Sequence, residues 1–136
     1  MRIAVVVLAL IAAGCGGGAP RTNADRPPAP VTMTAAIHER GLEVSPASVG
    51  AGPIVLVVSN QTSRPQRVTF ETDELGASRP GTTASTQQIA PHGTGRLSID
   101  AHTGRYSVHA GDRTIRAAHV RIGARRRSSQ DQLLLP

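Results

Sequence analysis

Two of the five histidines in the sequence are placed where they could hold a metal ion together. Tyr106 and Val108 alternate with polar residues, which is the period of a strand with one buried face, so His109 is expected to point outward. The following strand is expected to bring His119 to the same face, where diagonal neighbours lie about 7–8 Å apart. His109 and His119 are therefore a candidate site for copper or zinc, although a closed site usually takes three or four ligands.

Catalytic side chains do not form a recognisable set in this sequence. Asp73 and Glu74 are adjacent, so on a strand they would point to opposite faces and could not act as a converging acid and base pair. The acidic residues of segment 71–81 are expected to lie in an exposed loop. A nucleophile elbow, a phosphate-binding glycine loop and a zinc-protease motif are all missing from the sequence. We therefore expect that the protein is not an enzyme.

The N-terminus has the pattern of a secretion signal. Arg2 provides a positive charge, residues 3–13 are apolar, and small residues stand just before Cys15. As a helix the apolar run would rise only about 16 Å, too short for a bilayer core of about 30 Å. Residues 12–15 resemble the lipobox of bacterial lipoproteins, with Ala12 where Leu is usual. The resemblance implies cleavage after residue 14 and a lipid on Cys15.

The lipid explains why an exported chain carries a single cysteine, which has no partner for a disulfide. Two acyl chains would hold the protein stably at the cell membrane, on its extracytoplasmic face. The alternative is an ordinary secretion signal followed by a chance cysteine. Residues 15–30 are rich in Gly and Pro and are expected to form a disordered tether. Residues 124–136 are expected to form a disordered basic tail.

The charge of the chain is positive, at +6, and every basic residue is an arginine. The only run is 125–127, and no aromatic side chains stand beside it to stack on bases, so we do not expect nucleic acid as a partner. Anionic lipid headgroups or wall polymers are a more plausible partner for this run, at about 1 kcal/mol per arginine.

Residues 31–123 are predicted to form one all-β domain. Short β-branched runs alternate with turns rich in Gly and Pro, including 50–53, 78–81 and 91–93. The predicted strands are 31–38, 42–44, 54–60, 67–72, 85–89, 95–99, 105–109 and 115–122. Seven or eight strands at this spacing predict a Greek-key β-sandwich. Tyr106 is expected to bond back to the backbone upstream, as in the corner of such sandwiches.

The turns and strands of this domain resemble those of the cupredoxins. Residues 41–46 and then 52–60 look like the opening of that family, in which a strand, a glycine turn and a hydrophobic strand end in asparagine, here Asn60. Residues 89–93 and 104–108 are similar to its later part, a Pro-Gly turn followed by a Gly-x-Tyr strand. The resemblance covers residues 31–123 and implies a cupredoxin-like sandwich.

The same resemblance implies that the copper chemistry of the family is missing. Gln66 stands where the first histidine ligand belongs, Ala110 where the cysteine belongs, and Arg116 near the place of the methionine. A blue copper site needs a thiolate and imidazoles, and the only thiol is Cys15. We therefore expect no cofactor and no electron transfer through copper.

The function expected from these observations is that of a non-catalytic module for interaction at the cell envelope. The partner would be an envelope protein or polymer, contacted through the loops 73–83 and 60–66, because binding residues usually lie on loops of a rigid sandwich. The alternative is a copper-handling protein that uses His109 and His119.

Overall fold

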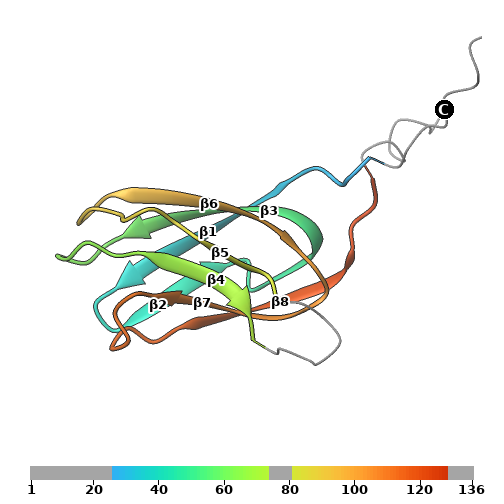
Figure 1. Ribbon diagram of the computed structural model, residues 1–136. Coiled ribbons are helices and arrows are strands. Elements are labelled where there is room, and N and C mark those ends of the chain that lie inside the picture. Colours follow the sequence, from blue (N-terminus) through green and yellow to red (C-terminus); the bar gives the residue numbers. More distant parts are fainter. Residues whose placement is uncertain (1–25, 74–80, 129–136) are drawn as a thin grey trace, which may run out of the picture.

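The computed structural model describes residues 26–73 and 81–128 of the chain, and these form eight β-strands without a helix (Figure 1). The prediction of an all-β Greek-key sandwich with seven or eight strands is confirmed. The strands are β1 (Val31–His38), β2 (Gly41–Ser45), β3 (Ser48–Asn60), β4 (Val68–Thr72), β5 (Thr83–Ser85), β6 (Thr94–Ala101), β7 (Gly104–Ala110) and β8 (Ala118–Arg125).

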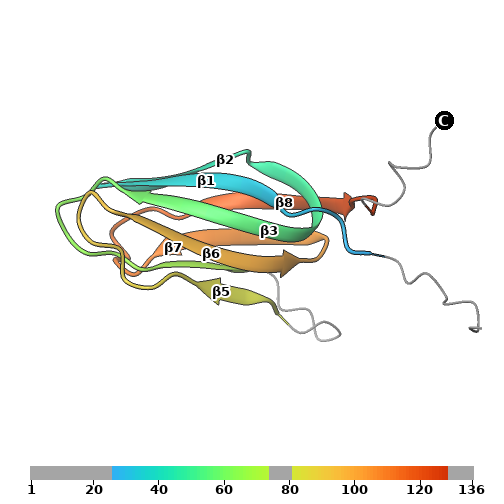
Figure 2. The same cartoon turned by 90° about the horizontal axis from the view of Figure 1, so that it is seen from above.

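The strands form two layers that face each other across the core. The first layer has the order β2-β1-β3-β6, and these strands lie side by side in Figure 2. The second layer has the order β8-β7-β4-β5. The chain crosses between the layers after β3, β5 and β6, as in a Greek key. Two pairings are parallel, β1 with β3 and β3 with β8, and the other pairings are antiparallel.

Strand β3 belongs to both layers. Its first residues pair with β8, and from Gly52 onward it pairs with β1 and β6. The register with β8 shifts between Gly50 and Ala51, and Gly52 has a φ of 128°, a conformation that favours glycine. The sequence predicted a turn between two strands at 50–53. This prediction was wrong, because the glycines bend one long strand from layer to layer instead of ending it.

The core is aliphatic apart from two aromatic rings. Alternate residues of each strand point inward, and Phe70 of β4 packs against Tyr106 of β7 with ring centroids 5.3 Å apart. The Tyr106 hydroxyl donates to the His102 carbonyl at 3.0 Å and accepts from the His102 amide at 3.0 Å. The tyrosine corner expected from the sequence is therefore present, and it closes the turn between β6 and β7.

Several predicted strand limits differ from the structure. Strand β5 comprises Thr83–Ser85, whereas Ile89, the end of the predicted strand, makes only an isolated bridge to Gln66. Strand β8 starts at Ala118 and not at Ile115, because the preceding residues form a loop. Glu71 lies inside β4 and not in an exposed loop.

The C-terminal boundary of the sandwich also lies later than predicted. Strand β8 continues to Arg125, and Arg126 donates hydrogen bonds to the carbonyls of Gly50, Pro53 and Ala29, so residues 124–126 belong to the domain and not to the tail. The signal 1–14, Cys15 and most of the tether lie outside the described residues. Among the described residues, no helix is long and apolar enough to cross a membrane.

Candidate functional site

Ionisable side chains gather on the outer face of the second layer, and the pairing of β4, β7 and β8 places them there. Ser107 of β7 stands between Glu71 of β4 and His119 of β8. His109 stands opposite Thr69, and Arg105 stands opposite Arg121. Because these residues alternate with core residues along each strand, they all face away from the core.

Each of the two candidate metal ligands on this face is paired with a carboxylate. His109 Nε2 lies 3.0 Å from Glu71 Oε1, and His119 Nδ1 lies 3.2 Å from Asp73 Oδ2. The His119 side chain is 74% exposed, whereas the Asp73 side chain is only 22% exposed. The structure therefore brings the predicted residues to one face, and it adds two acidic residues, Glu71 and Asp73, that were expected in an exposed loop.

The sequence did contain a signal for these carboxylates. Glu71 and Asp73 are two residues apart, so both side chains point to the same face if the chain stays extended beyond β4. His119 and Arg121 of β8 are also two residues apart and share a face in the same way. The predicted strand and β4 both end at Thr72, but the Asp73 amide still donates to the Arg105 carbonyl at 2.9 Å, which keeps Asp73 beside β7. In the described part of the chain, no group of three or more His, Cys, Asp or Glu side chains is close enough to hold a metal.

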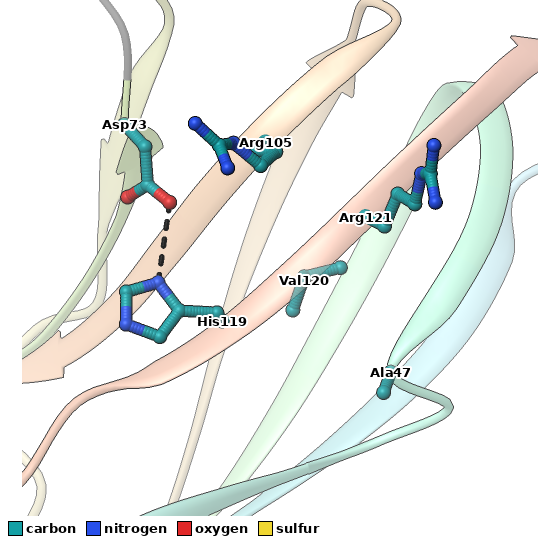
Figure 3. A pocket seen from close by; sticks show the side chains of 6 residues that line it. All are labelled: Ala47, Asp73, Arg105, His119, Val120 and Arg121. Atoms are coloured by element: carbon teal, nitrogen blue, oxygen red, sulfur yellow. Dashed lines mark hydrogen bonds and ion pairs between the residues drawn. The ribbon is translucent and has the colours of Figure 1, made fainter.

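A hollow of about 510 Å³ opens beside the Asp73–His119 pair (Figure 3). Its lining comes from β7, β8, the residue that follows β4 and the β2–β3 connection: Ala47, Asp73, Arg105, His119, Val120 and Arg121. Figure 3 shows the Asp73 and His119 side chains meeting over the sheet while Arg121 extends away from them. The lining contains two arginines and one carboxylate, that of Asp73, which is paired with His119.

The loops at one end of the sandwich are organised by the buried side chain of Asn60. Its amide nitrogen donates to the carbonyls of Arg64, Ile89 and Ala90, at 2.8, 3.2 and 3.1 Å. Its carbonyl oxygen accepts from the amide and the hydroxyl of Thr62, at 3.1 and 2.8 Å. All polar capacity of Asn60 is used inside the protein, so this residue fixes the loops and is not available to a ligand.

The positions where the resemblance places copper ligands lie around the same loops. Gln66 is buried and its backbone exchanges hydrogen bonds with Ile89, at 2.9 and 2.7 Å. Ala110 is buried at the end of β7, and Ile115 from the following loop is also buried, at 4% exposure. Arg116 is exposed and its carbonyl accepts from the Leu42 amide at 2.9 Å.

The loop between β7 and β8 is held by Asp112. Its Oδ1 accepts from the Thr114 hydroxyl at 2.6 Å and from the Thr114 amide at 2.9 Å, and its Oδ2 accepts from Arg64 at 2.8 Å. These bonds favour the ionised form, so the Thr114 hydroxyl first, then its amide and the Arg64 charge, lower the pKa of Asp112. The Arg64–Asp112 ion pair connects this loop to loop 60–66.

The other surface expected to bind a partner, loop 73–83, lies mostly outside the described residues. Its first residue, Asp73, is part of the face described above.

His92 and His102, which the sequence placed in turns, are both exposed and stand on separate turns of the chain. His92 has a φ of 57°.

Comparison with known proteins gives structural likenesses alone, because no family model and no curated protein matches the sequence. The chain is similar to auracyanin A, a blue copper protein of Chloroflexus aurantiacus, with 12% identity and a TM-score of 0.49 over 70% of this chain and 100% of that one. It is also similar to the multicopper oxidase McoA of Aquifex aeolicus, with 14% identity and a TM-score of 0.41 over 71% of this chain and 30% of that one. Both are likenesses of architecture, and neither brings a function to this chain.

Proposed function

We propose that this chain is an exported lipoprotein whose cupredoxin-like sandwich binds a partner at the cell envelope without a metal and without catalysis. The observation that carries the proposal is the closed end of the sandwich at loops 60–66 and 111–117. Ala110 and Ile115 are buried there among apolar residues, and Asp112 links the two loops through Arg64. The burial of Ala110 and Ile115, neither of which offers a ligand atom in its side chain, supports a domain that works without copper.

The residue types at this end also support the proposal. Blue copper sites use a thiolate and two imidazoles, whereas Gln66 and Ala110 offer an amide and a methyl group. The amide of Gln66 is a weak ligand for copper and the methyl group of Ala110 is none. A sandwich that keeps rigid loops without these ligands is suited to presenting a binding surface.

Metal analysis of the untagged protein, purified from its native membrane, tests the metal-free part of the proposal. We expect less than stoichiometric copper and zinc and no blue absorption band. Stoichiometric copper would overturn it. Intact-mass measurement of the same sample tests the anchor, because a lipid on Cys15 adds the mass of its acyl chains. An unmodified mature chain would remove the lipid anchor from the proposal.

A copper-handling function is the second candidate, and the orientation of the two histidines favours it. His109 uses Nε2 for Glu71, and His119 uses Nδ1 for Asp73, so within residues 26–73 and 81–128 the other nitrogen of each imidazole has no hydrogen-bond partner. A carboxylate on one ring nitrogen is the usual support of a histidine that binds metal through the other.

Titration with copper while the histidine NMR signals are followed separates the two candidates. If the protein handles copper, the His109 and His119 signals change together at one equivalent, and the change is lost in His109→Gln but not in His92→Gln. Under the metal-free proposal, all five histidines respond alike and only to excess copper.

A further inference from the structure

We infer that the loop end of the sandwich binds an acidic segment of a partner protein, through exposed arginines that lie beside a small apolar patch. The loop end comprises turn 39–40, loop 60–67, turn 90–93 and loop 111–117. The inference names the class of partner for the interaction module proposed above, and it rests on that proposal only for the existence of a partner at the envelope.

The first observation is an excess of positive charge at the loop end. Five exposed arginines lie in these segments: Arg40, Arg64, Arg67, Arg113 and Arg116. The acidic residues there are Glu39 and Asp112, so five arginines against two carboxylates leave a net charge of +3. Asp112 is paired with Arg64 at 2.8 Å. Within the ranges 26–73 and 81–128, the other four guanidinium groups have no hydrogen bond or ion pair.

The second observation is that bonds between the loops hold these arginines on one surface. The Gly111 amide donates to the Arg67 carbonyl at 2.8 Å. The Arg116 amide donates to the Arg40 carbonyl at 3.2 Å, so loop 111–117 contacts two other segments that carry arginine. Because the charges come from separate segments, they form a broad patch and not a site for one small anion. Such a patch is complementary to a chain that carries several carboxylates.

The third observation is an apolar patch at the loop end, formed by Pro65, Ala90 and Pro91. All three residues are exposed. Gln66 pairs with Ile89, so the residues next to them, Pro65 and Ala90, lie side by side. Protein–protein interfaces combine an apolar centre with a polar rim and are enriched in arginine. This composition favours a protein over a phosphate polymer, which has no apolar side chains to pack against the prolines.

Nucleic acid and the membrane surface fit the loop end less well. Phe70 and Tyr106, the aromatic residues of the chain, are both buried, so no ring can stack on bases. Residues 26 and 128 lie at the other end of the sandwich (Figure 1), and β1 alone separates the two ends by about 25 Å. The loop end therefore points away from the tether, toward a partner protein and not toward the headgroups around the anchor.

Peptide binding by the full protein, purified from its native membrane in a neutral detergent, tests the inference. The probes are a fluorescent peptide of alternating glutamate and proline and one of alternating glutamate and serine, of equal length and charge. Fluorescence anisotropy should show about fivefold tighter binding of the glutamate–proline peptide, as burial of roughly 40 Å² of apolar surface would give. Salt should weaken the binding of both peptides. In Arg67→Gln/Arg113→Gln the affinity should fall about tenfold, since an exposed ion pair contributes roughly a factor of three.

The matched control is Arg121→Gln/Arg127→Gln, which removes the same charge from exposed positions on β8 and beyond its end. Arg113→Gln alone, with an expected fall of about threefold, keeps the test valid if the double variant folds poorly. An equal fall in the control, equal affinity for the two peptides, or tighter binding of a glycerol phosphate polymer of the same charge would overturn the inference. Absence of peptide binding by a protein that is metal-free and carries its lipid would overturn it too, while leaving the proposed function standing.

Discussion

Arg126 is expected to be a main determinant of stability, although it lies in the basic run predicted to be a disordered tail. Its Nε donates to the Gly50 carbonyl at 3.1 Å and its terminal nitrogens donate to Pro53, at 2.6 Å, and to Ala29. These carbonyls belong to the bend of β3 and to the end of the tether. One side chain therefore connects three segments that meet at this end of the sandwich.

The expected effect of Arg126→Gln follows from these contacts. A hydrogen bond from a charged donor contributes about 1.5–3 kcal/mol, but the site is only partly buried and an ordered arginine loses up to about 2 kcal/mol of side-chain entropy. The net loss in free energy of unfolding should be about 2–3 kcal/mol. Urea unfolding measures it, and the midpoint should fall by about 1–2 M with an unchanged slope.

Two further variants separate geometry from charge. Arg126→Lys keeps the charge but cannot form the planar fork, so it should lose most of the same free energy. Arg127→Gln removes an exposed arginine next in sequence and should change stability by less than about 0.5 kcal/mol. Equal unfolding midpoints for Arg126→Gln and Arg127→Gln would refute the reasoning, because the three carbonyl contacts would then contribute nothing.

Three other variants test the loops. Tyr106→Phe removes both hydrogen bonds of the corner and should cost about 1–2 kcal/mol, measured as a lower melting temperature; unchanged melting would count against the corner. Asn60→Ala leaves buried carbonyls without a donor and should cost about 3 kcal/mol in urea unfolding, more than any substitution of an exposed loop residue. Because the folded-state pKa of Asp112 lies below its ordinary value of 3.8, its contribution is complete above that value and is lost as the pH falls through the lowered pKa. The Thr114 amide signal should therefore titrate with a midpoint below 3.8, and it should not do so in Asp112→Asn; a midpoint above 3.8 in the unchanged protein would contradict this.

The features predictable from sequence were those set by local patterns. Alternation in 105–109 placed Tyr106 in the core and His109 outside, because the side-chain period of a strand is two whatever its partners are. The tyrosine corner was predictable for the same reason, since it joins residues four apart in sequence. The histidines of the candidate site were thus assigned to the correct face.

The partners of those histidines depended on register between distant strands. Glu71 reaches His109 across 38 residues of sequence, and Asp73 reaches His119 across 46. No local pattern fixes which residues of β4, β7 and β8 stand side by side. The bend of β3 was missed for a similar reason, because Gly50 and Gly52 signal an unusual backbone but not whether the strand ends there or changes layers.

The dual membership of β3 has a consequence for the order of folding. The first half of β3 finds its partner in β8, the last strand, and the second half lies between β1, the first strand, and β6. A chain that emerges with its N-terminus first can complete the first layer once β6 has appeared, but it cannot complete the second layer, or pair the first half of β3, until residues near 125 have appeared. Parallel pairing over such sequence separations closes long loops at an entropic cost before the contacts can stabilise them. The domain is therefore expected to fold slowly, within about milliseconds to seconds, as one late step after the whole chain is free.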